Sequence, residues 1–489
     1  MVPMQPSDVN PDLEGLLERL ASLAEDSQPA GAEPCAVSPT AARPPHRTPS
    51  RDDELPAQPA PAAVVPAEEA FFPVAPRSLA DTKVAESEIE GIILRLLMHR
   101  GTSTGVEISQ QIGLPFPVTE KLLHAMKAER LLVLKSAAAL SDYLYEITDL
   151  GLQRARQSAA QYNYCGTVPV ALSDYVASVA AQSLGRVKPR MENLRRAFAD
   201  LIISPEMFGR LGRAIRSGRG LFLHGPPGNG KTSIAERITA AYGASIWIPR
   251  AIGVWGEIIR LFDPSCHEEL PLATGERIVA EEKIDHRWVR IRRPTIVVGG
   301  ELTMESLEIT VHKETGIGEA PIQMKSNGGT LVIDDFGRQR VAPQKLLNRW
   351  IVPLEARYDY LGLASGRKIC VPFDQFIVFS TNLEPRELVD EAFLRRIPYK
   401  IEVENPSVEQ FRRLFGETCR TQGIAHDEAA LDHLIAKHYD SAARPMRFCH
   451  PRDLLHQVGI FCRFRGLPPA MSVAALDAAA TDYFSVTGH

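Results

Sequence analysis

One short glycine-rich run constrains the fold of this chain more than any other part of it. The run reads Gly225-Pro226-Pro227-Gly228-Asn229-Gly230-Lys231-Thr232 and fits the pattern G-x-x-x-x-G-K-[ST]. The apolar stretch 220–224 before it is predicted to be a buried strand, and residues 232–242 after it carry a helical pattern. A strand, a tight turn and a helix N-terminus direct several unpaired backbone N–H groups to one place, where the helix dipole adds positive potential. This arrangement predicts a phosphate-binding loop in an α/β fold.

The side chains of the run indicate which phosphate compound it binds. Lys231 can reach the β- and γ-phosphates of a nucleotide, and the hydroxyl of Thr232 can approach Mg²⁺. The predicted ligands are therefore ATP and Mg²⁺. The candidate nucleotide-binding residues are Gly225, Pro226, Pro227, Gly228, Asn229, Gly230, Lys231, Thr232 and Ser233. The alternative is a chance match in a glycine-containing loop, which would make the flanking strand and helix patterns coincidental.

Composition and charge exclude several classes of protein. The 489 residues suffice for two or three domains, and 44% hydrophobic with 24% charged residues is ordinary for a soluble protein. A net charge of −5 argues against a globally cationic nucleic-acid coat and leaves a local basic patch open. No apolar run approaches the roughly 18–20 residues that cross a bilayer, and the N-terminal residues lack the regions of a signal peptide. We therefore expect a cytoplasmic protein without membrane insertion.

The seven cysteines stand singly along the chain, without a C-x-x-C pair. An odd and scattered set is typical of reduced thiols rather than of a disulfide framework. The pairs Cys266-His267 and Cys449-His450 each lack a second pair at ligand spacing, so no metal site other than that for Mg²⁺ is predicted.

The first eighty residues are predicted to be disordered apart from one short helix. Residues 10–25 carry leucines at helical spacing, whereas residues 28 to about 78 are rich in Pro and Ala and cannot bury enough apolar surface to offset their ordering entropy. The helix could act as a docking peptide or have no function, and the sequence leaves both readings open.

Residues 84–160 resemble a winged-helix domain. Helices are predicted at 88–99, 106–112 and 118–129, followed by strands at 131–134 and 143–147. The segment has eight basic and nine acidic side chains, whereas DNA binders normally present a basic face. A protein-docking or assembly role is therefore favoured, and DNA binding is kept as the alternative.

Two further strand patterns end in polar residues suited to a nucleotide site. The stretch 330–333 is followed by Asp334 and Asp335, and the stretch 376–381 by Asn382. A carboxylate beside the phosphate loop can hold Mg²⁺, and a second one can orient or deprotonate the attacking water. Asp334 and Thr232 are thus the candidate metal-binding residues, and Asp335 and Asn382 are candidate catalytic residues.

With these elements in order, residues 190–489 resemble the AAA+ ATPase family. The resemblance implies that the glycine-rich run is Walker A, that Asp334-Asp335 is Walker B and that Asn382 is sensor 1. It further implies that Arg395 or Arg396 is an arginine finger acting on a neighbouring subunit, and that Arg452 is sensor 2. From the residues alone, the first two could also be a solvated basic helix end, and Arg452 could form a surface ion pair with Asp453.

The expected fold is α/β, with four regions along the chain. Residues 1–80 are the disordered segment, 84–160 the winged-helix-like α+β domain, 161–400 the AAA+ nucleotide-binding domain, and 401–489 a small helical lid. The nucleotide-binding domain is expected to be a parallel sheet between helices. An insertion is expected at about 265–320 and suggests the MoxR-like branch of the family. Residues 247–249, 285–290 and 296–302, all between the glycine-rich run and Asp334, are expected to contribute an inserted β-hairpin that either packs on the domain or contacts a substrate.

The family resemblance implies a homo-oligomeric ring that hydrolyses ATP at its subunit interfaces and remodels or regulates a protein partner, as chaperones do. Asp-Asp replaces the usual Asp-Glu of Walker B, so the second carboxylate reaches less far and we expect slow, switch-like turnover. The main alternative is a DNA-associated ATPase, such as a loader or transcriptional switch. A scaffold that binds ATP without hydrolysing it is a third reading.

Overall fold

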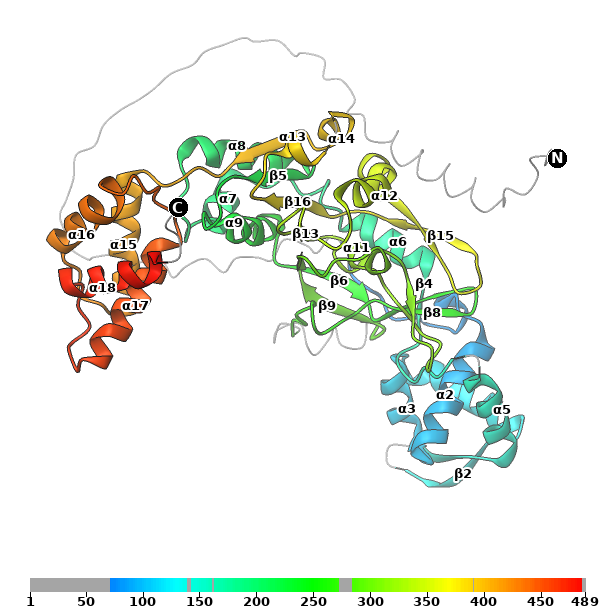
Figure 1. The fold of residues 1–489 in the computed structure, drawn as a ribbon. Helices are drawn as coiled ribbons and strands as arrows, with labels where there is room; N and C mark the ends of the chain where they lie inside the picture. Colours follow the sequence, from blue (N-terminus) through cyan, green and yellow to red (C-terminus); the bar gives the residue numbers. More distant parts are fainter. Residues whose placement is uncertain (1–70, 139–141, 161, 272–283, 390, 486–489) are drawn as a thin grey trace, which may run out of the picture. The chain divides into compact units, whose positions relative to one another are not determined.

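The computed structural model describes residues 71–489 except 139–141, 161, 272–283, 390 and 486–489 (Figure 1). The predicted helix at 10–25 and most of the Pro/Ala-rich segment lie outside the described residues. The centre of the predicted insertion, residues 272–283, lies outside them as well.

A five-stranded parallel sheet forms the centre of the nucleotide-binding region (Figure 1). All neighbouring strands in it pair in parallel, in the order β10-β13-β16-β5-β17. The strands are β5 (Leu221–His224), β10 (Thr295–Val298), β13 (Thr330–Ile333), β16 (Phe376–Thr381) and β17 (Tyr399–Glu402). Their near-continuous apolar sequence follows from burial of both faces of the sheet.

Alternate residues of the three central strands, β13, β16 and β5, enter two separate cores. In β5, Leu221 and Leu223 join one hydrophobic cluster and Phe222 joins the other. One face is covered by α7 (Met191–Ala197), α8 (Pro205–Ser217) and α9 (Lys231–Ile238), which continues as the 3₁₀ turn Thr239–Tyr242. The opposite face is covered by α12 (Pro343–Ala356) and α14 (Glu391–Arg396), and α13 (Pro385–Leu388) precedes α14.

A small helical domain follows the sheet. It contains α15 (Val408–Gln422), α16 (Glu428–Leu434), a π-helical turn (Ile435–Asp440), α17 (His450–Phe464) and α18 (Val473–Phe484), which share one core of their own. A capping box between Ser407 and Gln410 starts α15, and Gly423 with φ +67° ends it. The predicted fold class, α/β with a parallel sheet between helices followed by a small helical domain, is confirmed.

The N-terminal unit folds in the predicted order, with one extra strand. Its elements are α2 (Glu86–Arg100), β1 (Thr102–Thr104), α3 (Gly105–Ile112), α4 (Phe116–Ala128), β2 (Leu132–Ala137), β3 (Tyr143–Ile147) and α5 (Asp149–Ala159). The strands form an antiparallel sheet in the order β1-β3-β2. Helix α5 is capped by Thr148, whose hydroxyl accepts from the Gly151 N–H at 3.0 Å.

The elements inserted between α9 and β13 differ from the expected insertion. β6 (Ser245–Pro249) and β9 (Trp288–Arg292) pair in antiparallel fashion, so the expected pairing of these two stretches is present. Residues 296–298, however, belong to β10 of the central sheet, where they pair in parallel with β13, and the expectation that they join the hairpin was wrong. Residues 296–298 are apolar and β-branched, as strands of a buried parallel sheet are. A strand of a β-hairpin can have the same pattern, so the sequence alone does not distinguish the two.

A second sheet packs beside these strands. Its order is β11-β12-β8-β7-β4, and its strands are β4 (Val170–Ala171), β7 (Ala251–Val254), β8 (Glu257–Arg260), β11 (Thr310–Val311) and β12 (Gly318–Glu319). Helix α6 (Leu172–Ala181), the 3₁₀ turn Glu305–Leu307 and α11 (Ile322–Lys325) accompany it. A hairpin of β14 (Tyr358–Gly362) and β15 (Lys368–Pro372), which the sequence did not suggest, precedes β16.

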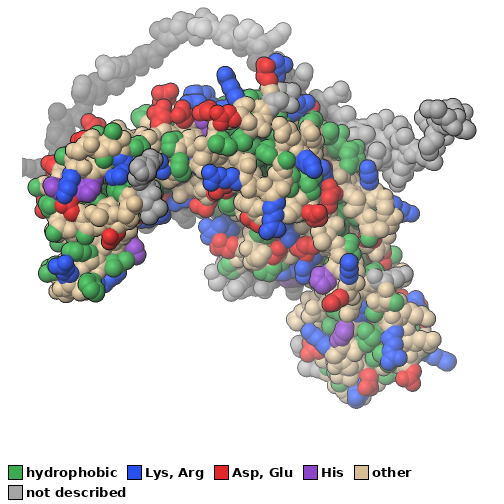
Figure 2. All heavy atoms as spheres, viewed as in Figure 1, with side chains coloured by type: hydrophobic (Ala, Val, Ile, Leu, Met, Phe, Trp, Pro, Cys, Tyr) green, Lys and Arg blue, Asp and Glu red, His purple; other side chains and the backbone are tan. Residues whose placement is uncertain are grey.

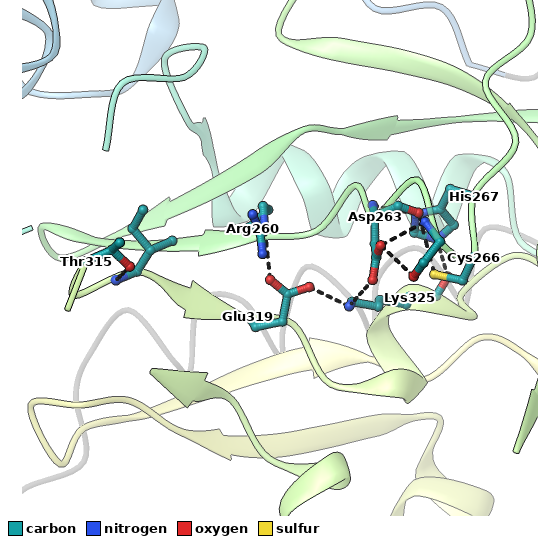
Figure 3. Close-up of polar contacts among 9 residues, drawn as sticks. Arg260, Asp263, Cys266, His267, Thr315, Glu319 and Lys325 are labelled. Carbon is teal, nitrogen blue, oxygen red and sulfur yellow. Dashed lines mark hydrogen bonds and ion pairs between the residues drawn. The ribbon is translucent and has the colours of Figure 1, made fainter. Parts of the chain in front are cut away.

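Ion pairs connect α11 to this second sheet, as Figure 3 shows. The ammonium of Lys325 pairs with Asp263 at 2.7 Å and with Glu319, which also accepts from Arg260 at 2.8 Å. Both ring nitrogens of His267 are used: Nδ1 accepts from the Asp263 N–H, and Nε2 lies 2.9 Å from the Lys325 carbonyl oxygen. Burial raises the pKa of the neighbouring Cys266 thiol to about 11, so this thiol is protonated at neutral pH.

Within the part of the chain that the structure describes, no helix combines the length and apolar character needed to span a bilayer.

Candidate nucleotide-binding site

The glycine-rich loop lies between the end of β5 and the start of α9, as the sequence predicted. Gly225, Gly228 and Gly230 have φ values of +130°, +81° and +75°, which side chains disfavour. A Cβ on Gly225 would lie 2.6 Å from the Val403 carbonyl oxygen, and one on Gly228 would lie 2.6 Å from the sulfur of Cys449. The glycines therefore allow the tight turn of the loop, and two of them allow its close approach to Val403 and Cys449.

Lys231 lies across the loop that carries it. Its ammonium donates to the carbonyl oxygens of Gly225 at 2.8 Å and Pro226 at 2.9 Å, and to Oδ1 of Asn382 at 2.7 Å. The side chain is buried, and burial lowers the pKa of Lys231, while the carboxylates of Asp334 and Asp335 act in the opposite direction. The charge is thus held at the centre of the loop by neutral acceptors and two nearby acids.

The two acidic residues follow β13 and face the same place. The Thr232 hydroxyl donates to Oδ2 of Asp334 at 2.7 Å, and Asn382 donates to Oδ1 of Asp335 at 3.2 Å. Asp335 adopts φ +47°, and its N–H donates to Oδ1 of Asp334 at 3.0 Å. Since parallel strands β13 and β16 are neighbours, their carboxyl ends bring the acids and Asn382 together.

The oxygen atoms of Thr232 and Asp334 suit a magnesium ion. Mg²⁺ prefers a few protein oxygens and keeps several waters and phosphate oxygens as its other ligands. A hydroxyl and a carboxylate in hydrogen-bond contact at the mouth of a phosphate loop match that preference, so these two residues fit the ion.

A cavity of about 530 Å³ joins these groups. Its lining includes the loop from Pro227 to Ser233, both acids, Asn382 and Arg452. Residues from the segments 200–207 and 402–405 line it as well, and no sequence motif marks them as part of the site. Every residue predicted to contact nucleotide within one subunit therefore borders this cavity or, for Gly225 and Pro226, holds Lys231 beside it.

Arg452 borders the cavity and also forms the surface ion pair with Asp453 that the sequence suggested as an alternative. It lies in the first turn of α17, borders the cavity, and is 74% exposed. Its Nε also donates to Oδ1 of Asp453 at 3.0 Å, so the surface ion pair is present. The Arg452 side chain thus lines the cavity while its hydrogen bond to Asp453 orients the guanidinium.

Arg395 and Arg396 lie away from the cavity. With Arg219 and Arg357 they line a second hollow of about 590 Å³. Arg219 comes just before β5 and the helix α14 comes just before β17, so this hollow is at the amino ends of the strands, opposite the phosphate loop. The structure does not bring these two arginines together with the other predicted catalytic residues of the same chain.

The two arginines differ in how firmly they are held. The Arg395 side chain is 78% exposed and pairs with Glu391 of its own helix at 3.0 Å. The Arg396 side chain is 24% exposed and pairs with Glu355 of α12 at 2.8 Å. Arg395 is the more available of the two to a group outside the chain.

Arg447 is a functional candidate that sequence reasoning missed. Its side chain comes within 3.7 Å of the position of a Cβ on Gly228, and its charge contributes to lowering the pKa of Lys231. Cations are disfavoured at a helix N-terminus, yet Arg447 and Arg452 flank the start of α17. Two arginines at a helix N-terminus are a sequence pattern that indicates an anion site, because a bound anion would offset both the arginine charges and the positive potential of the helix.

Comparison with known proteins gives limited likenesses. Residues 407–482, which cover most of the helical lid, match a family described as Domain of unknown function (DUF8689). Over 76 residues the chain is 32% identical to the 26S proteasome subunit RPT4 of Saccharomyces cerevisiae, a match covering 16% of this chain and 17% of that subunit.

Solved structures similar to the chain include NtrX from Brucella abortus in complex with ADP, at 15% identity and a TM-score of 0.36. That likeness covers 59% of this chain and 57% of NtrX. The Holliday junction branch migration motor RuvB of Thermotoga maritima is similar at 13% identity and a TM-score of 0.32, over 62% of this chain and 74% of RuvB.

Proposed function

We propose that the chain is an AAA+ ATPase that binds ATP with Mg²⁺ at the glycine-rich loop and hydrolyses it to ADP and phosphate. One observation carries the proposal: Lys231, Thr232, Asp334, Asp335 and Asn382 converge on one cavity from three neighbouring strand ends. This set supplies a phosphate cradle, a cation, two metal-binding oxygens and a second acid. Placement in the MoxR-like branch is part of the same proposal.

The residues act in a definite order in this proposal. The Lys231 ammonium exchanges the carbonyl oxygens of Gly225 and Pro226 for phosphate oxygens of ATP. Asn382, already bonded to Asp335, orients the attacking water beside that carboxylate. The oxygen of the water forms a bond to the γ-phosphorus while Asp335 accepts a proton from the water. The bond between the γ-phosphorus and the oxygen that it shares with the β-phosphate breaks, and ADP leaves with that oxygen. Thr232 and Asp334 would hold Mg²⁺, which would neutralise part of the charge on the phosphates.

A second subunit completes the site. Arg395 and Arg396 lie at the edge of the sheet opposite the phosphate loop, so neither can serve the loop of its own chain. An arginine at that edge can reach the γ-phosphate of a neighbouring copy in a ring, where it stabilises the charge on the phosphoryl group in transfer. A homo-oligomer with shared sites is therefore proposed.

The partner is proposed to be a protein, recruited by the N-terminal unit and remodelled or regulated as by a chaperone. Lys and Arg are interspersed with Asp and Glu over the visible face of the described residues, as Figure 2 shows. Such mixed charge favours protein contacts over the phosphate backbone of DNA. A cytoplasmic location is also proposed, supported by the free thiols of the described cysteines, such as Cys165 and Cys419.

DNA association is the second candidate, and one observation favours it. Lys121, His124 and Lys127 are exposed along α4, the third helix of the winged-helix-like unit. If they contact phosphates, Lys121→Glu with Lys127→Glu should abolish duplex binding and its dependence on salt, with ATP turnover kept. Fluorescence anisotropy with a labelled duplex at 50 and 200 mM salt decides between the candidates, and absence of binding by the native protein excludes DNA.

The proposed function is tested by measuring ATP turnover against protein concentration, with the mass followed by light scattering in ATP and in ADP. Turnover per subunit should rise as the assembly forms, because each site needs an arginine from another copy. Turnover that is the same in a monomer at every concentration would exclude the shared site. Absence of both nucleotide binding and turnover would exclude the ATPase itself.

A further inference from the structure

The side chain of Asn229, inside the glycine-rich loop, makes its hydrogen bonds to other parts of the chain. Its amide nitrogen donates to Oδ1 of Asn405 at 2.9 Å, to the Glu404 carbonyl oxygen at 3.2 Å and to that of Val403 at 3.4 Å. Its amide oxygen accepts from the Phe448 N–H at 3.4 Å. The side chain is 3% exposed, so these protein partners replace water.

The partners of Asn229 belong to two segments, one that leads into the helical lid and one that lies within it. Residues 403–405 connect β17, the edge strand of the central sheet, to α15, the first lid helix. Phe448 lies just before α17, the lid helix whose first turn carries Arg452. One carboxamide therefore joins the phosphate loop, the connection to the lid and the lid itself.

Backbone contacts beside Asn229 leave little room for these three segments to move independently. The Cys449 N–H donates to the Gly228 carbonyl oxygen at 2.9 Å. The Cβ positions of Gly225 and Gly228 are closed off by Val403 and Cys449 respectively. A change in the backbone of the loop must shift the connection and the start of α17, or break these contacts.

We propose that Asn229 is a positioning residue that transmits the nucleotide state of the loop to the orientation of the lid. This rests on the proposed ATP binding, in which Lys231 releases the carbonyl oxygens of Gly225 and Pro226. The loop itself needs only backbone N–H groups at position 229 to cradle phosphate. The amide nitrogen of Asn229 nevertheless bonds residues 403–405, and its amide oxygen bonds Phe448 of the lid. Asn229 therefore couples both segments to the loop.

The test is hydrogen exchange of the full chain, followed in peptides covering 403–410 and 447–455, without nucleotide, with ADP and with a non-hydrolysable ATP analogue. The native protein should show exchange in both peptides that changes with the nucleotide. Asn229→Ala should bind ADP within about threefold of the native affinity, lose most of that change, and turn over ATP about tenfold more slowly. Loss of turnover without loss of affinity separates a positioning role from a binding one.

Two further variants control the comparison. Asn405→Ala removes one acceptor of Asn229 at an exposed position outside the loop, and should reduce the exchange response in part. Asn193→Ala, at an exposed position of α7, should leave everything unchanged.

Several outcomes would overturn the coupling. One is an unchanged exchange response and turnover in Asn229→Ala, and another is a loss of ADP binding as severe as that of Lys231→Ala, which would assign Asn229 to the cradle. If Asn229→Ala does not fold, an unaltered response in Asn405→Ala rejects the idea. A native protein that binds ADP without any exchange response in these peptides rejects the coupling alone, whereas one that binds no nucleotide rejects the proposed function as well.

Discussion

Lys231 shows how oxygen atoms of the protein satisfy a buried charge. An unpaired ammonium in this position would be costly to bury, and three oxygen acceptors within 2.9 Å offset that cost. The same acceptors are weak competitors for the charge compared with a phosphate oxygen. The residue is thus stable in the loop and ready to exchange its partners.

Lys231→Ala should lower ATP affinity by about 30-fold or more, because a charge-assisted contact to the phosphates is lost. Isothermal titration with ATP and Mg²⁺ measures the affinity directly. Lys345→Ala, at an exposed position of α12, is the matched control and should bind like the native protein. Native affinity in Lys231→Ala would move the phosphates to another place.

The left-handed backbone of Asp335 offers a reason for Asp rather than Glu at this position. A φ of +47° is tolerated better by Asp and Asn than by longer side chains, so the short acid fits the turn after β13. Asp335→Asn keeps this backbone preference and the shape of the side chain, and removes only the basic carboxylate.

We expect Asp335→Asn to bind ATP normally and to hydrolyse it about 100-fold more slowly, since no base receives the proton of the water. A coupled phosphate-release assay measures turnover, and titration confirms binding. The native enzyme itself should turn over no faster than about one ATP per second. Native turnover of tens per second, or an active Asp335→Asn, would contradict the role given to this acid.

At the scale of elements, strands that are buried on both faces were predicted well. The stretches 330–333 and 376–381 begin and end where the sequence indicated, because polar residues mark their ends at the site. β10 has the same apolar pattern, but only its pairing with β13 reveals the sheet to which it belongs. The helical character of residues 401–489 was predicted, whereas the π turn that follows α16 was not.

The site was predictable where chemistry follows a local motif, and not where it depends on contacts between distant residues. Lys231, Thr232 and the two acids carry recognisable patterns. Asn229 looked like one more loop residue, since its partners are 174 to 219 positions away in the sequence. The alternative assignments for Arg452 could not be separated from the sequence, because its ion pair with Asp453 and its place in the cavity lining are compatible with each other.

The lid contains a histidine that should make its stability depend on pH. Burial lowers the pKa of His450 to about 4, and the charges of Arg447 and Arg444 act in the same direction. In the unfolded chain the pKa is about 6.5, so below that value the unfolded state binds a proton that the folded state refuses. The stabilisation is complete above pH 6.5 and is lost as pH falls to about 4, by up to about 3 kcal/mol.

Urea unfolding of the native protein and of His450→Gln between pH 4.5 and 7.5 measures this contribution. The variant should lose the part of the pH dependence that falls in this window. His456→Gln, at an exposed position of the same helix, should retain it. Parallel curves for the native protein and His450→Gln would assign the pH dependence to other groups.

For the whole molecule, the separation of Arg395 and Arg396 from the phosphate loop makes a prediction about mixed assemblies. Arg395→Ala should lower turnover about 100-fold with ATP affinity kept, and Arg396→Ala should have the smaller effect because Glu355 already holds that side chain. Mixing Arg395→Ala subunits with Lys231→Ala subunits should restore part of the activity, because each supplies what the other lacks. No recovery in the mixture, measured by phosphate release, would place the missing arginine elsewhere.

The N-terminal unit shares its hydrophobic core with the rest of the protein. Ala251 of β7 and Ile258 of β8 belong to the same cluster as Ile89 and Leu97 of α2. Cutting the chain between the two would leave an apolar patch uncovered on the ATPase fragment and invite aggregation. A chimaera that joins residues 162–489 to a foreign N-terminal unit would therefore fold well only if the foreign unit presented matching apolar side chains at this contact.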